Sequence, residues 1–180
     1  HSYLDLYEEL FHAKAQSATH VLEVGIGPIP HQNGGSIMMW ANYFPNAQVH
    51  AMDILPICDV RKDLITHPRI HLHTSNDAYN PYIVLSTFLS KRMEFDIVLD
   101  DGPHTLTSMA AFITLYSRVL KSDGILVIED VQDIEWIHTL RDVTPAELKP
   151  YIEVYDRRPI KGRYDDIVFV INLSKKRGDD

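Results

Sequence analysis

Two apolar segments that each end in acidic residues most constrain what this chain can fold into. Residues 95–101 run from an apolar strand pattern into two aspartates, and residues 124–130 run from a similar pattern into a Glu-Asp pair. The helix-patterned segment between them predicts that the two strands are parallel neighbours in one sheet. Because paired strands lie roughly 5 Å apart, we expect Asp101, Glu129 and Asp130 to meet at the carboxyl edge of that sheet.

Three carboxylates at one point repel one another unless a cation lies among them. A ligand set made only of oxygen atoms suits magnesium, manganese or calcium better than zinc. The pattern therefore indicates a divalent metal site at Asp101, Glu129 and Asp130. The alternative is that these acids cap helices or end strands and face water.

The rest of the chain alternates between strand and helix patterns. Apolar residues recur at helical spacing over residues 2–16, 37–44, 80–92 and 106–120, and strand patterns occupy residues 20–27, 48–53, 69–73, 152–155 and 167–172. This alternation predicts an α/β fold with a doubly wound, mostly parallel sheet of seven strands. The last two strands have no long crossover helix between them, so we expect an antiparallel strand at the C-terminal edge. We predict one domain over residues 1–180, cut from a longer polypeptide because the chain starts at His1 and enters a helical pattern at once.

A glycine turn after the first predicted strand separates two kinds of nucleotide site. A dinucleotide fingerprint requires a third glycine, and Pro30 occupies that position after Gly25 and Gly27. A nicotinamide or flavin cofactor is therefore disfavoured, and the remaining pattern is Glu23-x-Gly-x-Gly. The second strand ends in Asp53, which is where doubly wound folds bind a ribose diol.

The composition argues against several classes of partner. Seventeen Lys and Arg against twenty-five Asp and Glu give a net charge of −8, which disfavours a nucleic-acid partner. Cys58 is the only cysteine, so no internal disulfide can form and a reducing compartment is expected. No apolar run approaches the roughly 20 residues that span a bilayer, and no signal-peptide pattern opens the chain. We therefore expect a cytoplasmic protein without a membrane partner.

These motifs resemble those of class I S-adenosylmethionine-dependent methyltransferases, whose first motif has the Glu-x-Gly-x-Gly form. More specifically, the chain resembles the metal-dependent O-methyltransferases that act on the deoxysugars of macrolide antibiotics, of the mycinamicin and tylosin type. The segments that carry this resemblance are residues 3–11, 34–36, 44–45, 53, 101–104 and 128–130. Pro103 departs from the family pattern, in which a serine is more usual, and the chain lacks the N-terminal extension of full-length relatives.

The resemblance implies a Rossmann-like class I methyltransferase fold that binds S-adenosylmethionine and Mg²⁺ or Mn²⁺. It implies that Asp101, Glu129 and Asp130 bind the metal, and that Asp101 and His104 are catalytic, with His104 as the general base. For Asn76 and Asp77, an adenine contact and a helix-capping role are both open. The residues expected to bind the cofactor are Glu23, Gly25, Gly27, Ser36, Asp53, Asn76, Asp77 and Asp100.

The expected substrate is a sugar or glycoside with a vicinal diol, because a divalent ion can bind two adjacent hydroxyls and lower their pKa. We also expect a place in a larger glycan-building protein with covalently linked glycosyltransferase domains; the oligomeric state is open. One alternative is a catechol-type O-methyltransferase, although those enzymes typically have Asp-Asn where this chain has Glu129-Asp130. Another is a non-catalytic module retained for packing. The basic segment Arg157 to Arg163 is either a solvated hairpin or a grip on substrate or a partner.

Overall fold

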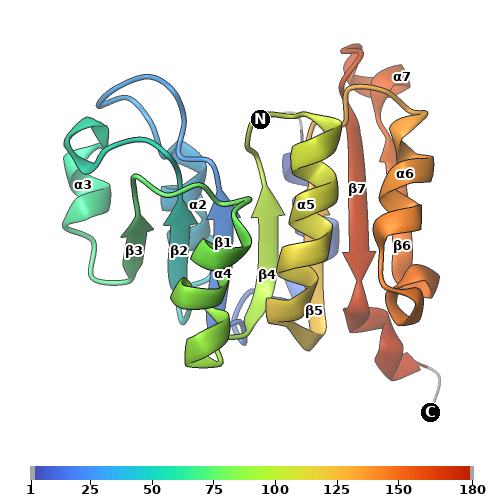
Figure 1. Cartoon of the computed structure of the whole chain (residues 1–180), viewed down its shortest axis with the longest axis horizontal. Coiled ribbons are helices and arrows are strands. Elements are labelled where there is room, and N and C mark those ends of the chain that lie inside the picture. The colour runs from blue at the N-terminus through green and yellow to red at the C-terminus, as the bar shows by residue number, and fades with distance from the viewer. Residues whose placement is uncertain (1–2, 179–180) are drawn as a thin grey trace.

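One sheet with helices on both faces forms the centre of the molecule (Figure 1). The computed structural model describes residues 3–178. The strands lie in the order β3-β2-β1-β4-β5-β7-β6 across the sheet, and they are β1 (His20–Val24), β2 (Gln48–Met52), β3 (Ile70–His73), β4 (Phe95–Asp100), β5 (Leu120–Ile128), β6 (Ile152–Asp156) and β7 (Ile167–Asn172). The α-helices are α1 (Leu4–Phe11), α2 (Gly35–Tyr43), α3 (Lys62–Ile65), α4 (Pro81–Thr87), α5 (Leu106–Tyr116), α6 (Trp136–Val143) and α7 (Arg158–Lys161). Short 3₁₀ segments are His12–Lys14, Ile57–Asp59, Leu89–Lys91, Ser117–Val119, Ala146–Tyr151 and Leu173–Gly178.

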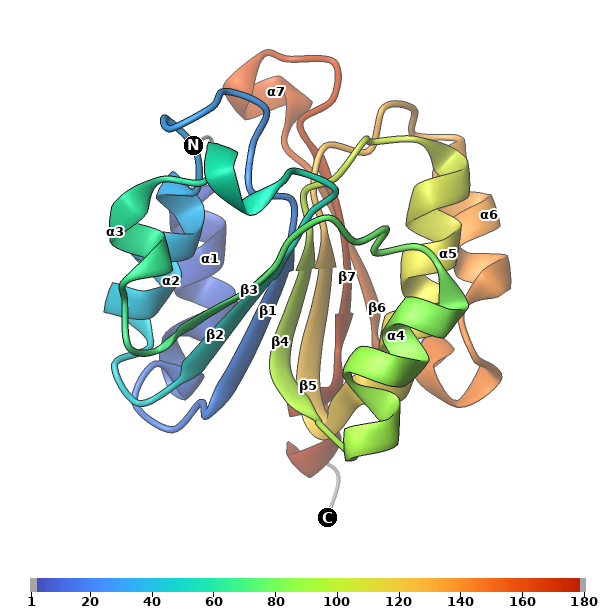
Figure 2. The same ribbon diagram turned by 60° about the vertical axis from the view of Figure 1, so that its left-hand side comes forward.

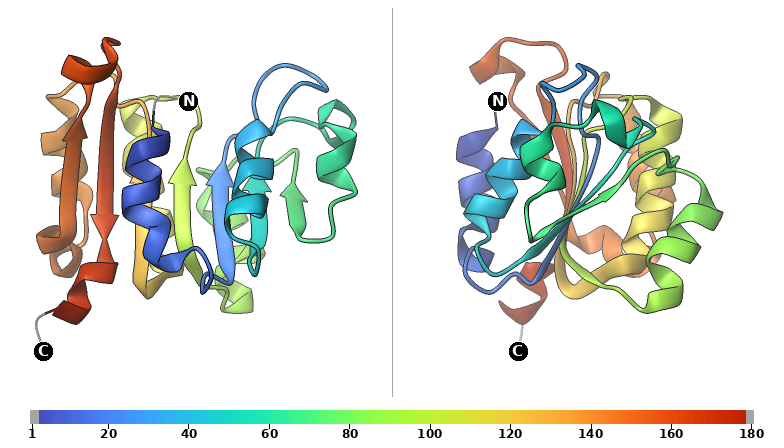
Figure 3. Two further views of the ribbon diagram at one scale, coloured as in Figure 1. Left: turned by 180° about the vertical axis from the view of Figure 1, so that it is seen from behind. Right: turned by 90° about the vertical axis from the view of Figure 1, so that its left-hand side faces the viewer.

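The helices divide into two layers around the sheet (Figure 2). Helices α1, α2 and α3 cover one face, and α4, α5 and α6 cover the other, which the end-on view in Figure 3 also shows. The helix after β1 and the helix after β4 therefore lie on opposite faces of two adjacent strands. In doubly wound sheets, ligands usually bind outside the carboxyl ends of such a pair of strands.

The predicted architecture is confirmed. Strands β1 to β5 run parallel, and the C-terminal strand β7 runs antiparallel to both of its neighbours. One detail differs: β7 lies between β5 and β6 and is not the edge strand. The reason is that β7 is apolar on both faces and wholly buried, whereas β6 carries Glu153 and Asp156 and is only partly buried. A strand with exposed charges is suited to the edge of a sheet.

The α-helices α1, α4 and α5 are shorter than the apolar periodicity predicts. The predicted helix over residues 2–16 is α-helical over Leu4–Phe11 and continues as a 3₁₀ turn, and the helix predicted over residues 106–120 ends its α-helical part at Tyr116. Final turns often tighten in this way. Within the described part of the chain, no helix has the length and apolar character needed to cross a membrane.

A buried carboxylate ties α2 to β1. The Glu23 side chain accepts hydrogen bonds from Ser36 Oγ at 2.9 Å and from Trp40 Nε1 at 2.9 Å. The Trp40 ring packs edge-on against Tyr7 and Phe11 of α1, with ring centroids 5.1 and 5.6 Å apart. Burial raises the pKa of Glu23 to about 8. This carboxyl group therefore anchors the helical layer that carries α1 and α2.

Three histidines stack against the opposite face, on β2 and β3. The ring centroid of His50 lies 4.7 Å from that of His71 and 5.2 Å from that of His73. His50 Nδ1 and His73 Nε2 are 2.9 Å apart, so one nitrogen donates its proton to the other. Burial, followed by the charge that His73 would carry, lowers the pKa of His50 to about 3.

The substitution Glu23→Gln should change how stability depends on pH. Between its ordinary value of 4.5 and its folded value of about 8, the Glu23 carboxyl keeps in the folded state a proton that the unfolded chain loses. Its contribution to stability is therefore complete below pH 4.5 and is lost as the pH rises to 8. The glutamine variant lacks this titration. The free energy of unfolding of Glu23→Gln minus that of the wild type should therefore be larger at pH 8.5 than at pH 5.5, by on the order of 1–3 kcal/mol.

Urea unfolding at the two pH values measures this difference. Glu94→Gln, at an exposed glutamate, is the matched control and should follow the wild type. An identical pH dependence for both variants would contradict the assignment of this titration to Glu23.

Candidate active site

A cavity of about 1120 Å³ lies at the carboxyl ends of β1, β2 and β4. It is bordered by the glycine turn after β1, the tip of β2, the segment after β3 and the loop after β4. The predicted site residues that line this cavity are Gly25, Gly27, Ser36, Asp53, Asn76, Asp77, Asp101 and His104. The structure thus brings most of the residues selected from the sequence to one place.

The glycine turn is shaped by the neighbouring strand. Gly25 has a φ of +103°, and a Cβ atom there would lie 2.1 Å from the carbonyl oxygen of Asp101. The Asp101 amide in turn donates a hydrogen bond to the carbonyl of Val24 at 2.9 Å. Only glycine permits both the positive φ and this close approach. The turn after β1 and the acidic loop after β4 are therefore built against each other.

Asp53 holds the turn from the other side. Its Oδ2 accepts a hydrogen bond from the amide of Ile26 at 2.7 Å, and its Oδ1 accepts one from the amide of Leu55 at 3.0 Å. Each carboxylate oxygen has a second lone pair, so Asp53 can also accept hydrogen bonds from a ligand in the cavity.

Asn76 and Asp77 both line the cavity and both take part in local turns. Asn76 Nδ2 donates to the carbonyl of Thr74 at 2.8 Å, and Asp77 Oδ1 accepts from the amide of Tyr79 at 2.9 Å. The helix-capping role that the sequence left open is instead filled by Asn80, whose side chain accepts from the amide of Tyr82 at the start of α4. An adenine contact stays a prediction.

Glu23 and Asp100 are not among the residues that line the cavity, and their predicted contact with a cofactor stays a prediction. Strand alternation turns Glu23 into the layer of α2, where Ser36 and Trp40 bind it. Asp100 is buried on the opposite side of the sheet, and its Oδ1 accepts a hydrogen bond from the Tyr79 hydroxyl at 2.6 Å. Burial raises the pKa of Asp100 to about 7. Both carboxyl groups are therefore buried outside the cavity, on opposite sides of the sheet.

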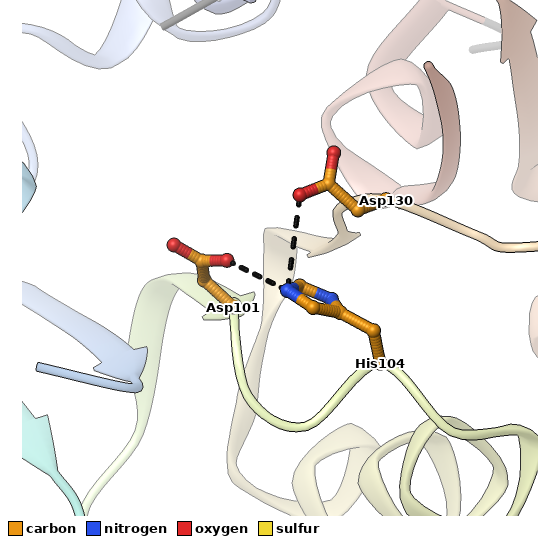
Figure 4. Close-up of side chains that lie close together, drawn as sticks. All are labelled: Asp101, His104 and Asp130. Carbon is orange, nitrogen blue, oxygen red and sulfur yellow. Dashed lines mark ion pairs between the residues drawn. The ribbon is translucent and has the colours of Figure 1, made fainter. Parts of the chain in front are cut away.

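Asp101, His104 and Asp130 come together at the acidic end of the site, as Figure 4 shows. One potential ligand atom from each lies within 4.8 Å of the other two. His104 Nε2 is 3.3 Å from Asp101 Oδ1 and 3.8 Å from Asp130 Oδ2. The interaction with Asp101 raises the pKa of His104. His104 and Asp130 also have positive φ angles of 56° and 54°, and strain of this kind is concentrated at functional sites.

Glu129 lies outside this group of three side chains, although the sequence predicts it as a metal ligand. Strand β5 ends at Ile128, and the positive φ of Asp130 turns the chain immediately afterwards. The side chains of Glu129 and Asp130 therefore take different directions. Glu129 is 5% exposed, and burial followed by the charge of Asp130 raises its pKa to about 8. Burial therefore favours the neutral form of Glu129 next to the group.

Two tyrosines that sequence reasoning did not select support the acidic loops. Tyr79 lines the cavity and bonds Asp100, and a Cβ on Gly102 would lie 1.9 Å from its hydroxyl, which explains the glycine in the Asp-Gly-Pro-His turn. Tyr3 donates a hydrogen bond to Asp130. Both contacts join residues far apart in the sequence, so no local pattern reveals them.

The basic segment between β6 and β7 is largely paired with nearby acids. Arg157 forms an ion pair with Asp5 of α1, and Arg158 forms one with Asp156 at 2.6 Å. These ion pairs fit a structural hairpin better than a cationic surface that binds a substrate or a partner.

No family model matches the chain. The chain is 34% identical over 134 residues to the 8-demethyl-8-(2-methoxy-alpha-L-rhamnosyl)-tetracenomycin-C 3'-O-methyltransferase of Streptomyces olivaceus, a match that covers 73% of this chain and 32% of that protein. It is 29% identical over 139 residues to the mycinamicin VI 2''-O-methyltransferase of Micromonospora griseorubida, covering 76% of this chain and 33% of that protein. The chain thus spans about a third of the length of these curated relatives.

The solved structures agree on the fold. The mycinamycin-pathway methyltransferase MycE, in complex with Mg and SAH, superposes with a TM-score of 0.73 at 21% identity, covering 96% of this chain and 50% of that one. The chain therefore has the class I methyltransferase fold and resembles the O-methyltransferases of macrolide and related antibiotic sugars over about three quarters of its length.

Proposed function

We propose that this domain transfers a methyl group from S-adenosylmethionine to a sugar hydroxyl. The observation that carries the proposal is the continuity of one cavity from the glycine turn and Asp53 to Asp101 and His104. Its volume of about 1120 Å³ exceeds the roughly 300–1,000 Å³ of an ordinary small-molecule site, which leaves room for a cofactor and part of an acceptor together. The relatives reported above are named as O-methyltransferases of glycosylated natural products.

The cofactor would occupy the part of the cavity nearest β1 and β2. The glycines of the turn allow a ligand to approach the backbone closely, and Asp53 at the tip of β2 is placed for a ribose diol. Asn76 and Asp77 line the same part of the cavity beyond β3 and are the proposed contacts to adenine.

The acidic end of the site fits a divalent cation. Asp101 and Asp130 offer carboxylate oxygens within one group, and Glu129 adds a buried acid beside them. Burial raises the pKa values of Asp130 and Glu129, which shows that their negative charge is poorly compensated by the protein alone. An oxygen donor set suits Mg²⁺ or Mn²⁺. When bound, such an ion lowers the pKa of coordinated hydroxyl groups.

His104 is the proposed general base. Its ring lines the cavity, and Asp101 lies 3.3 Å from Nε2 and orients it. A sugar hydroxyl loses its proton with difficulty at neutral pH, whereas the methyl group of a sulfonium needs no further activation. The task of the chain is therefore to orient the hydroxyl and accept its proton as the new oxygen–carbon bond forms. The carbon–sulfur bond of the sulfonium breaks in the same step, its electron pair goes to sulfur, and the neutral thioether S-adenosylhomocysteine leaves.

Several wider expectations stay predictions. They are a cytoplasmic location, the absence of nucleic-acid and membrane partners, and linkage to glycosyltransferase domains. Mass spectrometry of glycosides with vicinal diols, incubated with the protein, S-adenosylmethionine and Mg²⁺, tests the central proposal. The expected product carries one added methyl group. Methylation of catechols with no reaction on any glycoside would contradict the sugar assignment.

The substitution Asp101→Asn should abolish methyl transfer while S-adenosylmethionine affinity stays within a few-fold of the wild type. The reason is that it removes a negative charge from the acidic group and leaves the glycine turn intact. Steady-state assays and calorimetric titration with S-adenosylmethionine measure the two effects. Asp142→Asn, on an exposed position of α6, is the control. Full activity in Asp101→Asn would show that the metal assignment is wrong.

The substitution His104→Ala should lower the transfer rate by roughly 10²- to 10⁴-fold, the usual contribution of a general base. Imidazole added to the assay should restore part of the loss, because it can enter the vacated space and accept the proton. His138→Ala, at an exposed histidine of α6, should retain wild-type activity. A His104→Ala enzyme that stays within a few-fold of the wild type would exclude the general-base role.

A further inference from the structure

Tyr3, at the start of α1, reaches the acidic group from the other end of the sequence. Its hydroxyl donates hydrogen bonds to Asp130 Oδ1 at 2.5 Å and to the carbonyl oxygen of Asp165 at 3.3 Å. Tyr3 is 2% exposed. A carboxylate and a carbonyl only accept, so the single hydroxyl proton is shared between them, and the shorter contact to Asp130 is the stronger hydrogen bond. Folding of α1 against the sheet therefore brings this donor to the strand-end acid.

The two oxygens of Asp130 have different surroundings. Oδ1 accepts the hydrogen bond from Tyr3, whereas Oδ2 lies 3.8 Å from His104 Nε2, on the side where Asp101 completes the group (Figure 4). The bond from Tyr3 thus opposes rotation of the Asp130 carboxylate and leaves Oδ2 directed at the acidic group. The backbone is constrained as well, since the φ of Asp130 is +54°.

We propose that Tyr3 is a positioning residue that holds Asp130 in the orientation needed to bind a divalent cation. The proposal rests on the proposed function, because it assumes that Asp101 and Asp130 are metal ligands. A hydrogen bond to one oxygen of a ligating carboxylate fixes its orientation before the ion arrives, and loss of such a partner typically costs 10- to 100-fold in metal affinity or activity. Tyr3 acts through Asp130 and is not proposed to touch the substrate.

Tyr7 provides a matched control on the same helix. It lies one turn after Tyr3, its ring is 6.1 Å from that of Tyr3, and it is buried to a similar degree. Its hydroxyl, however, has no hydrogen-bond partner among the described residues. Replacement of either tyrosine by phenylalanine keeps the ring and removes only a hydroxyl. A difference between the two variants therefore reports the hydrogen bond that Tyr3 makes.

Calorimetric titration of the metal-free chain with Mn²⁺ tests the proposal directly. Tyr3→Phe should bind Mn²⁺ about 10- to 100-fold more weakly than the wild type, and Tyr7→Phe should bind it like the wild type. Affinity for S-adenosylmethionine should be unchanged in both variants. In an Asp130→Asn background, adding Tyr3→Phe should have little further effect on Mn²⁺ affinity, because the residue through which Tyr3 acts is already altered.

The outcomes separate this inference from the function on which it rests. If the wild type binds Mn²⁺ and Tyr3→Phe binds it equally well, the positioning role is wrong and the metal site stands. If the wild type binds no Mn²⁺ even with S-adenosylmethionine present, the metal-dependent function fails and the inference fails with it. A Tyr3→Phe chain that does not fold, as judged by thermal unfolding, would also contradict the proposal, because the hydroxyl would then be a requirement of packing.

Discussion

Electrostatic repulsion between acids gathered at the ends of two neighbouring strands is the constraint on which the rest of this site depends. The parallel register of β4 and β5 pairs Asp100 with Ile128, so the residues that follow each strand leave the sheet side by side. Asp101 and Asp130 are thereby brought together in a partly buried place, where charge is less well screened than in water. Two neighbouring side chains interact with these carboxylates: His104, from the loop after β4, contacts Asp101, and the Tyr3 hydroxyl, at the start of α1, donates a hydrogen bond to Asp130.

The same register links the acidic end of the cavity to the glycine turn. Gly25 lies against the backbone of Asp101, and the Asp101 amide bonds to Val24 at the end of β1. A ligand held on the turn is therefore adjacent to the acids, with no intervening element to position it. This proximity suits a transfer reaction, because two reactants held at short range avoid the entropic cost of finding each other.

Local pattern was enough to predict the fold and the strand-end residues. Asp53 and Asp101 directly follow β2 and β4, and Asp130 comes two residues after the end of β5. Parallel strands carry such residues to one edge whatever their detailed packing. The directions of the Glu23 and Asp100 side chains were predicted less well than the positions of the strand ends. Glu23 and Asp100 lie within strands, so alternation turns them into the helical layers beside the cavity. The order of β6 and β7 was predictable in principle, because the charges of β6 mark it as the edge.

Long-range contacts lay beyond sequence reasoning. The Tyr3 hydroxyl and Asp130 are 127 residues apart, and only the docking of α1 joins them. Glu129 was selected because it sits beside Asp130, yet the chain turns between the two residues, and adjacency in sequence did not become adjacency of side chains. Such features depend on the completed packing of several elements, and one strand or one turn does not contain them.

The stack of imidazoles on β2 and β3 makes stability depend on pH in the opposite sense to the buried carboxyl groups. His50 stays neutral in the fold down to about pH 3, so acidification below about 6.5 favours the unfolded chain, in which the ring is free to take up a proton. The buried carboxyl groups of Glu23 and Glu129 act in the reverse sense, because their contribution to stability is lost as the pH rises from about 4.5 to about 8. Protonation of His50 therefore lowers stability at acidic pH, and ionisation of Glu23 and Glu129 lowers it as the pH approaches 8.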